Sequence, residues 1–473
     1  MPRHYQAGHT QSTTQSENDM KQEVNIWTSR FAFLISAAAA SIGLGSLWRF
    51  PYVAGTNGGG AFVLLYILFI ALLCAPIIIA EMVIGKKGGG STVASLKNLV
   101  ASENANGKWR AIGWISLLIP FFGLSMYSVI AGWCVEYARL SIFQGFDGVD
   151  AESSKAIFTN LVSTPAHQLL VQSLFIVAVA WVVGKGLHAG IERISRIKMT
   201  ALFIVLLGIV AYNALSVGLM PSIEFMFKPD FSKMTSVGVL AAFGQALFST
   251  GIGVGVLMTY SAYLPKGISL PQSGILLSIA VVAVALLAGL AIFPTVLHFG
   301  LAPAEGPNLI FVTMPIAFAQ MPGGHFIAIV FFCLFALAAF TSAVGLLEPV
   351  VAWVMERTQW SRRRAAFRAA LAVWLVSLPS LLSFNVLKDV FPLNFIPFLK
   401  GKTVFDILDF GIANVMLPLN GLLIALFAGW VINKASTRAE FSSTSRIYPL
   451  WRFALCYASP LAIAGLMWSL IRS

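Results

Sequence analysis

The sequence predicts an all-α membrane protein. Of its 473 residues, 58% are hydrophobic and only 11% are charged, a balance that would leave a water-soluble domain with a mostly apolar surface. Apolar runs of about 20 residues, long enough to cross roughly 30 Å of hydrocarbon as a helix, recur along the chain. Backbone polar groups in lipid must be satisfied internally, and the runs show no strand alternation, so the spans are expected to be helical.

Hydrophobic blocks bounded by charge or by Gly, Pro and Asn define the predicted spans. They cover 29–55, 60–85, 112–143, 167–184, 190–213, 237–263, 270–300, 324–356, 365–384, 403–432 and 447–471. The polar residues 1–25 are expected to form a disordered tail, and 26–473 a single transmembrane domain. Basic residues collect in the loops on the side of that tail, which predicts a multi-pass cell-membrane protein with a cytoplasmic N-terminus.

Several other classes of protein fit the sequence poorly. The net charge of +12 is scattered between spans rather than gathered on one soluble face, which argues against nucleic-acid binding. The cysteines lie in apolar segments at no metal-ligand spacing, so neither a disulfide nor a metal cluster is expected. The spans contain no constellation typical of catalysis, so an enzyme is not expected. The cysteines are Cys74, Cys134, Cys333 and Cys456.

Two spans are interrupted by glycine at corresponding places. IGLGSLWRFP (42–51) lies in the first span and STGIGVG (249–255) lies five spans later. Glycines in membrane helices also mark close helix packing. Matched interruptions instead indicate inverted repeats, here 29–213 and 237–432 with an extra helix at 447–471, and a binding site where the helices break.

At these interruptions the chain resembles the neurotransmitter:sodium symporter family, also called solute carrier 6-type transporters. The matching motifs are WTSRFAFLISAAAASIGLGSLWRFPYVAGTNGGGAF (27–62), IPFFGLSMYSVIAGW (119–133), GQALFSTGIGVGVLMTYSAY (244–263), LLAGLAIFP (286–294) and AAFTSAVGLLEP (338–349). The resemblance implies the 5+5 inverted-repeat fold of the bacterial leucine transporter, with discontinuous helices 1 and 6 and eleven transmembrane helices. It further implies sodium-coupled import across the bacterial inner membrane by alternating access.

The resemblance also implies a substrate site at the breaks. The carboxylate of an amino acid would bind the backbone at Leu44 and Gly45, and Gly43 stands where monoamine carriers have an aspartate. Small residues on the side-chain end of the site favour a hydrophobic amino acid. The implied contacts are Ala40, Gly43, Leu44, Gly45, Gly123, Tyr127, Ile130, Phe248, Ser249, Gly251, Val254, Ser342, Ala343 and Leu346.

One sodium ion is expected between helices 1 and 8. Its implied ligands are the carbonyls of Ala39, Ile42 and Ala338 and the hydroxyls of Thr341 and Ser342. The alternative is that the hydroxyls bond their own helix. The family's other sodium site draws on an Asn in helix 1, a hydroxyl in helix 6 and an Asn or Asp in helix 7. With Ser46, Ser249 and Ala280 at these positions it has lost side-chain ligands, so we expect one sodium and no strong chloride requirement.

Gates are implied on both sides of the site. Arg49 and Asp409 match the outer ion pair. Trp27, Tyr263 and Glu356 match inner gate positions, where Lys21 or Arg30 could replace a missing arginine. Two alternatives stay open: an amino-acid sensor on the same fold that does not transport, and a symporter for an osmolyte or a γ-aminobutyrate-like substrate.

Overall fold

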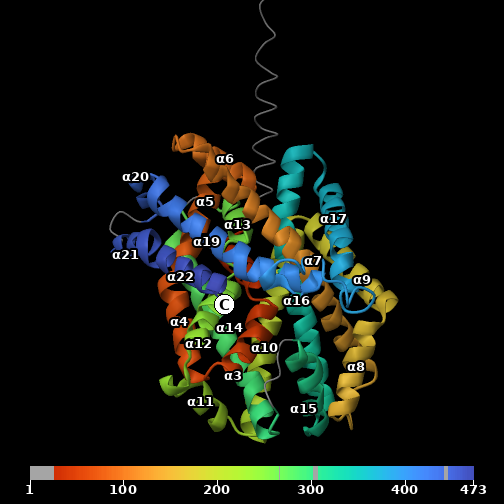
Figure 1. Cartoon of the computed structure of the whole chain (residues 1–473). Coiled ribbons are helices and arrows are strands. Elements are labelled where there is room, and N and C mark those ends of the chain that lie inside the picture. Colours follow the sequence, from red (N-terminus) through yellow and green to blue (C-terminus); the bar gives the residue numbers. More distant parts are fainter. Residues whose placement is uncertain (1–25, 266, 302–306, 442–445, 473) are drawn as a thin grey trace, which may run out of the picture.

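The computed structural model describes residues 26–265, 267–301, 307–441 and 446–472, so the predicted tail and Lys21 lie outside the described residues. Within these ranges the chain forms helices and no strands. Long helices lie side by side in one bundle (Figure 1). The predicted fold class, an all-α membrane protein, is confirmed.

The helices alternate with short 3-10 or π turns, which are labelled η. The first half contains α2 (Arg30–Ser41), η1 (Gly45–Arg49), α3 (Phe50–Thr56), α4 (Gly60–Phe69), η2 (Ile70–Cys74), α5 (Ala75–Gly88), α6 (Thr92–Ser102), η3 (Gly107–Arg110), α7 (Ala111–Phe143), α8 (Ala151–Ser163), α9 (Pro165–Gly184), η4 (Leu187–Glu192) and α10 (Arg193–Ser216). The second half contains α11 (Met220–Phe227), η5 (Phe231–Lys233), α12 (Ser236–Thr250), α13 (Val256–Ala262), α14 (Leu270–His298), η6 (Leu309–Thr313), α15 (Met314–Gln320), α16 (Gly324–Thr358), α17 (Arg362–Leu382), η7 (Pro397–Leu399), α18 (Val404–Phe410), η8 (Gly411–Met416), α19 (Leu417–Leu426), η9 (Phe427–Val431) and α20 (Lys434–Arg438). The C-terminal helix consists of α21 (Ile447–Phe453), η10 (Ala454–Ala458) and α22 (Ser459–Arg472).

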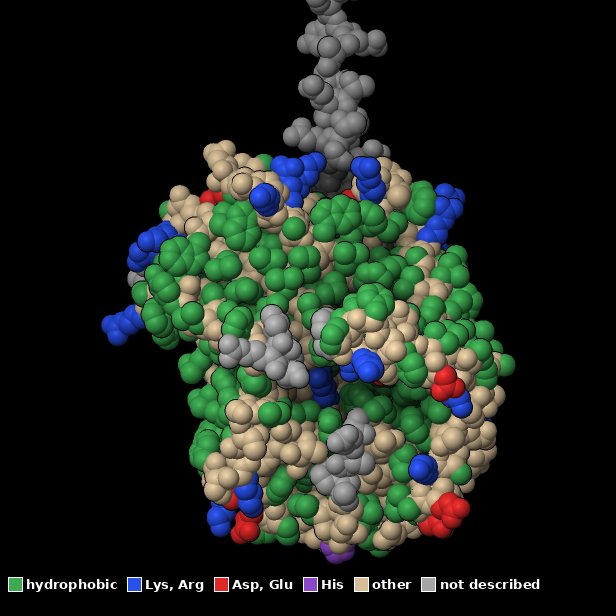
Figure 2. Space-filling view, viewed as in Figure 1, with side chains coloured by type: hydrophobic (Ala, Val, Ile, Leu, Met, Phe, Trp, Pro, Cys, Tyr) green, Lys and Arg blue, Asp and Glu red, His purple; other side chains and the backbone are tan. Residues whose placement is uncertain are grey.

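The described residues contain nine continuous helices that are long and apolar enough to cross a membrane. A tenth span is formed by Arg30–Ser41 and Gly45–Thr56, which meet at a bend of 59°. The remaining predicted span, 237–263, corresponds to the shorter helices α12 and α13 on either side of a break. Large apolar side chains on the outside, such as Leu215 (91% exposed), face where lipid is expected, and Figure 2 shows hydrophobic side chains over the middle of the molecule.

Both predicted helix breaks are present. α2 ends because Ile42 takes an extended conformation (φ −80°, ψ 92°). Between α12 and α13 the chain has positive φ at Gly251 (64°), Gly253 (81°) and Gly255 (79°), which only glycine adopts without strain. The buried carboxylate of Glu81 accepts the N–H of Gly255 at 3.0 Å, so α5 stabilises a backbone group that the break leaves without a helical partner.

The broken helices lie at the centre of the bundle. α16 packs along α7, and α10 packs against both α2 and α16. On the side of Arg49, the short element η6 packs on α8, and α15 packs on α16. The packing therefore brings α2, α10 and α16 into mutual contact, with α7 against α16.

Candidate functional site

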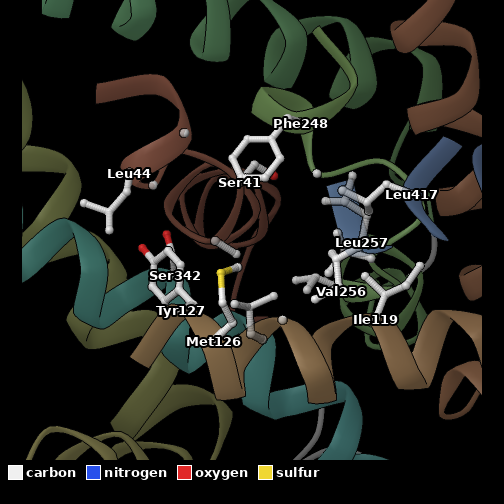
Figure 3. Close-up of a pocket in the computed structure, with 18 residues that line it drawn as sticks. Ser41, Leu44, Ile119, Met126, Tyr127, Phe248, Val256, Leu257, Ser342 and Leu417 are labelled. Carbon is white, nitrogen blue, oxygen red and sulfur yellow. The ribbon is translucent and has the colours of Figure 1, made fainter. Parts of the chain in front are cut away.

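A cavity of about 120 Å³ lies where the two broken helices meet. Its walls come from α2, η1, α7, the α12 to α13 segment, α16 and the η8 to α19 segment (Figure 3). Most of the substrate contacts expected from the sequence line it. The lining residues are Ala40, Ser41, Gly43, Leu44, Gly45, Ile119, Gly123, Met126, Tyr127, Phe248, Gly251, Val254, Val256, Leu257, Ser342, Leu346, Ile412 and Leu417.

One end of the cavity is polar. The hydroxyls of Tyr127 and Ser342 lie near each other in Figure 3. Both hydroxyl oxygens are buried, and neither makes a hydrogen bond of normal geometry with the described residues. A methyl group on Gly43 would lie 2.5 Å from Ser342 Oγ and 3.3 Å from Tyr127 Oη, so glycine leaves the backbone open to this end. Buried hydroxyls without partners are expected to bind a polar ligand group.

The other end of the cavity is apolar. Ile119, Met126, Val256, Leu257 and Leu417 form its wall (Figure 3), and none of them was among the predicted contacts. The helical period could have indicated the first two, because positions 119, 123, 126 and 127 share one face of α7. The contributions of α13 and α19 depend on packing between distant segments, which no local pattern specifies.

Three predicted substrate contacts do not line this cavity. Ile130 lines a second cavity on the Arg49 side. Ser249 is buried and its hydroxyl accepts a hydrogen bond from Gln245 Nε2 at 2.8 Å. The same amide group donates to the Gly45 carbonyl at 2.9 Å, which joins α12 to η1 beside the site. Ala343 is fully buried.

The second cavity, of about 310 Å³, adjoins the first on the Arg49 side. Phe248 and Tyr127 line both cavities. The predicted gate residues Arg49 and Asp409 both line the outer one, but no ion pair within 4.0 Å joins them in the described structure. The Arg49 guanidinium instead lies 4.2 Å from the centre of the Phe248 ring. The outer gate residues are thus close to the site and are not paired.

The end of the site that lies away from Arg49 is closed around Trp27. Trp27 is 2% exposed, and its Nε1 donates to the Tyr260 carbonyl at 2.7 Å. Its backbone N–H donates to the Tyr263 carbonyl at 3.0 Å. The Glu356 carboxylate accepts bonds from the backbone N–H and the hydroxyl of Ser91 at 2.6 and 2.5 Å.

Arg362, which was not predicted from the sequence, forms an ion pair in this inner region. Lys21 is not described, and Arg30 makes no ion pair among the described residues. Arg362 instead pairs with Glu348, whose carboxylate also lies 3.5 Å from the Tyr263 hydroxyl. In the sequence, Arg362 is the first of three consecutive arginines after a predicted span. Nothing in that pattern indicates which of the three forms an ion pair.

The expected sodium position contains a lysine side chain. Lys198 of α10 is fully buried, and its Nζ donates to the carbonyl of Ala39 at 2.7 Å and to that of Ile42. Thr341 Oγ1 donates to the carbonyls of Leu337 and Ala338 of its own helix, both at 3.2 Å. Two of the five expected sodium ligands therefore already accept hydrogen bonds from the Lys198 side chain.

Lys198 lies within the predicted span 190–213, but it was not singled out as part of the site. Lys198 lies inside the apolar helix Leu187–Ser216, which is long enough to span a membrane. The local signal was available, since Lys198 directly precedes the apolar run MTALFIVLLG. An ionisable residue next to such a run is a candidate functional residue.

The multiple apolar helices, the broken helices and the central cavity define a multi-pass membrane transporter. A family model described as "Sodium:neurotransmitter symporter family" matches residues 24–148 and 161–472. The chain belongs to this family, as the sequence motifs predicted, and it is not a member of an enzyme family.

Relatives support the same assignment. The chain is 37% identical to YhdH of Bacillus subtilis (strain 168), described as an uncharacterized sodium-dependent transporter, over 94% of this chain and 97% of that protein. It is 32% identical to an uncharacterized sodium-dependent transporter of Haemophilus influenzae, over 92% and 96% of the two chains. The crystal structure of MhsT in complex with L-phenylalanine matches with a TM-score of 0.85 and 36% identity, covering 94% of this chain and 99% of MhsT.

Proposed function

We propose that this chain imports a neutral, hydrophobic amino acid through the central cavity by alternating access. The observation that carries the proposal is the shape of that cavity, which has a polar end at the helix breaks and an apolar end between α7, α13 and α19. A hydrophobic amino acid is divided in the same way: its carboxylate and ammonium groups are charged, and its side chain is apolar. The structural match to MhsT with bound L-phenylalanine supports this substrate class.

Each end of the substrate would meet a different part of the broken helices. The helix Gly45–Thr56 begins at the cavity, so the amides of Leu44 and Gly45 and the helix dipole favour the carboxylate, with the Tyr127 hydroxyl as a further donor. The ammonium would bind carbonyls near the C-terminal ends of α2 and α12, at Ala40, Phe248 and Ser249. Anionic and cationic groups of one zwitterion are thereby bound by opposite helix ends.

The two sides of the site suggest how access alternates. In the structure, Arg49 and Asp409 are unpaired on one side, while Trp27 and its partners close the other. We propose that substrate binding closes Phe248 and the Arg49–Asp409 pair over the cavity, and that the Trp27 side then opens towards the cytoplasm. Differential binding of the substrate to the closed form supplies the free energy for this change.

The family is described as sodium symporters and YhdH as a sodium-dependent transporter, so coupling in this chain depends on what its two candidate sodium positions contain. The family's other sodium position has Ala280, with no side-chain oxygen, so we propose no second sodium there and no strong chloride requirement. The position between α2 and α16 requires a separate account, because the Lys198 ammonium binds two of its carbonyls.

Uptake into proteoliposomes tests the proposed function. The full chain is reconstituted and supplied with a panel of labelled neutral amino acids, betaine and γ-aminobutyrate, with an inward sodium gradient and with chloride replaced by gluconate in parallel. Uptake of hydrophobic amino acids that exceeds that of empty liposomes and survives chloride removal is expected. Saturable binding without uptake would instead identify a sensor, and uptake confined to betaine or γ-aminobutyrate would contradict the proposed substrate class.

Replacing Gly123 with leucine should shift selectivity towards small substrates. A Cβ at Gly123 would have no atom within 4 Å, so a larger side chain would extend into the cavity from the α7 wall. Overfilling an apolar site typically costs about 1 to 3 kcal/mol. A cost near the upper end of that range should lower uptake of L-phenylalanine roughly 30- to 150-fold. Uptake of alanine, whose side chain is small, should change little. Competition against labelled alanine measures both affinities.

Gly208→Leu is the matched control for this substitution. Gly208 is also a helical glycine with open space at its Cβ, but it lies exposed on α10 and does not line the cavity. This variant should retain the original preference. Equal loss of alanine and phenylalanine uptake in Gly123→Leu would contradict a role for Gly123 in setting the size of the site.

A further inference from the structure

We propose that the Lys198 ammonium is the resident cation of the site between α2 and α16, so that this site does not bind Na⁺ in this chain. The inference rests on the transporter proposed above; together with Ala280 at the family's other sodium position, it leaves neither of the two expected positions to bind Na⁺. Three observations carry it: the position of Nζ, the burial of the side chain, and the absence of a carboxylate partner among the described residues.

The position of Nζ is that of a coordinated cation. Its two acceptors are the carbonyls of Ala39, at 2.7 Å, and of Ile42. Because α2 ends at Ser41, carbonyls in its last turn lack the helical N–H groups that would follow. These free oxygens at a helix C-terminus attract positive charge. The expected sodium ligands include the same two oxygens, so the ammonium and the ion would occupy one place.

The burial of Lys198 shows that the placement is specific. Lysines normally extend towards water, but Lys198 is 0% exposed, and α10, which carries it, packs against both α2 and α16. Burying an ammonium is costly unless its protons are bonded, and here two carbonyl oxygens accept two of its three protons. No carboxylate lies within 4.0 Å of Nζ in the part of the chain described. The charge is therefore held by neutral oxygens, as a sodium ion would be.

Sodium does not fit beside this ammonium. Two unit charges roughly 4 Å apart near a protein site repel strongly enough to weaken binding of the second by about a thousandfold at an effective dielectric constant of about 20. The Thr341 hydroxyl, another expected ligand, donates its proton to its own helix, so its oxygen lone pairs stay free to coordinate a cation once the ammonium is removed. A covalently attached cation also stays behind when substrate leaves, so this site would carry no ion across the membrane.

Removing Lys198 should create a sodium response. Lys198→Ala leaves the carbonyls of Ala39, Ile42 and Ala338 and the hydroxyls of Thr341 and Ser342 without a competing cation. We expect sodium, compared with choline at equal concentration, to raise the Tm of detergent-solubilised Lys198→Ala clearly more than that of the wild-type chain. Adding Thr341→Ala to Lys198→Ala should abolish the additional shift. Lys97→Ala, which removes an exposed lysine of α6, should respond as the wild type does.

Two results would overturn the proposal. One is a sodium-dependent rise in the Tm of the wild-type chain that Thr341→Ala removes, a measurement that does not depend on whether Lys198→Ala folds. The other is a Lys198→Ala protein that folds, as size-exclusion chromatography shows, but responds to sodium no more than the wild type. Since Tm is read without substrate, these outcomes are distinct from failure of the uptake assay, which would contradict the proposed function instead.

Discussion

In the Gly43→Asp variant, affinity for L-phenylalanine is expected to fall about a thousandfold. The new carboxylate would enter the polar end of the cavity beside Tyr127 and Ser342, where the substrate carboxylate is proposed to bind. Two like charges roughly 4 Å apart at an effective dielectric constant of about 20 repel by about 4 kcal/mol, which corresponds to this factor. Phenethylamine, which has the same side chain and no carboxylate, should become the better ligand.

Gly43→Asn separates the charge from the volume of the new side chain. A Cβ at position 43 lies within 3.0 Å of Ser342 Oγ, so both variants require Ser342 to move and both should lose some affinity. Only the aspartate variant should reverse the preference between L-phenylalanine and phenethylamine, as measured by displacement of a labelled ligand. Equal losses in the two variants would mean that the substrate carboxylate does not bind at this end.

The fold was predictable from the sequence because the bilayer restricts what a chain of this composition can form. Long apolar runs specify helices, and the glycine clusters at 42–51 and 249–255 specify where two of them break. The span at 237–263 shows the limit of that reasoning. Its hydropathy is continuous, but three positive-φ glycines divide it into α12 and α13, neither of which alone is long enough to cross a membrane.

The candidate site was less predictable where it depends on packing between distant helices. Motif residues such as Gly43, Tyr127 and Ser342 meet in one cavity, as the resemblance implied. The roles of Lys198 and Arg362 depend on which carbonyl or carboxylate lies opposite them, at sequence separations of 159 and 14 residues. Charge and hydropathy place both near span ends and loops. Only the packed structure shows that each binds an acceptor inside the protein.

Removing the charge of Arg362 is expected to destabilise the protein by about 3 to 5 kcal/mol. Its partner Glu348 is fully buried in α16, so Arg362→Met would leave a carboxylate in the protein interior with only the distant Tyr263 hydroxyl, at 3.5 Å. Arg362 also donates through Nε to the Val183 carbonyl at 2.9 Å, and therefore links α17 to both α16 and the end of α9. Thermal unfolding of the purified protein in detergent should show a markedly lower Tm.

The double variant Arg362→Met with Glu348→Gln tests whether the unpaired charge causes this loss. Removing both charges eliminates the buried carboxylate, so the double variant should recover a large part of the stability that Arg362→Met alone loses. Arg364→Ala, two residues further along α17 and exposed, should leave Tm nearly unchanged. If the double variant were as unstable as the single one, Arg362 would stabilise the inner end of the bundle through its packing and its bond to Val183 rather than through its charge. The closed Trp27 side would then depend on the shape of this contact, and a change of charge alone could not open it.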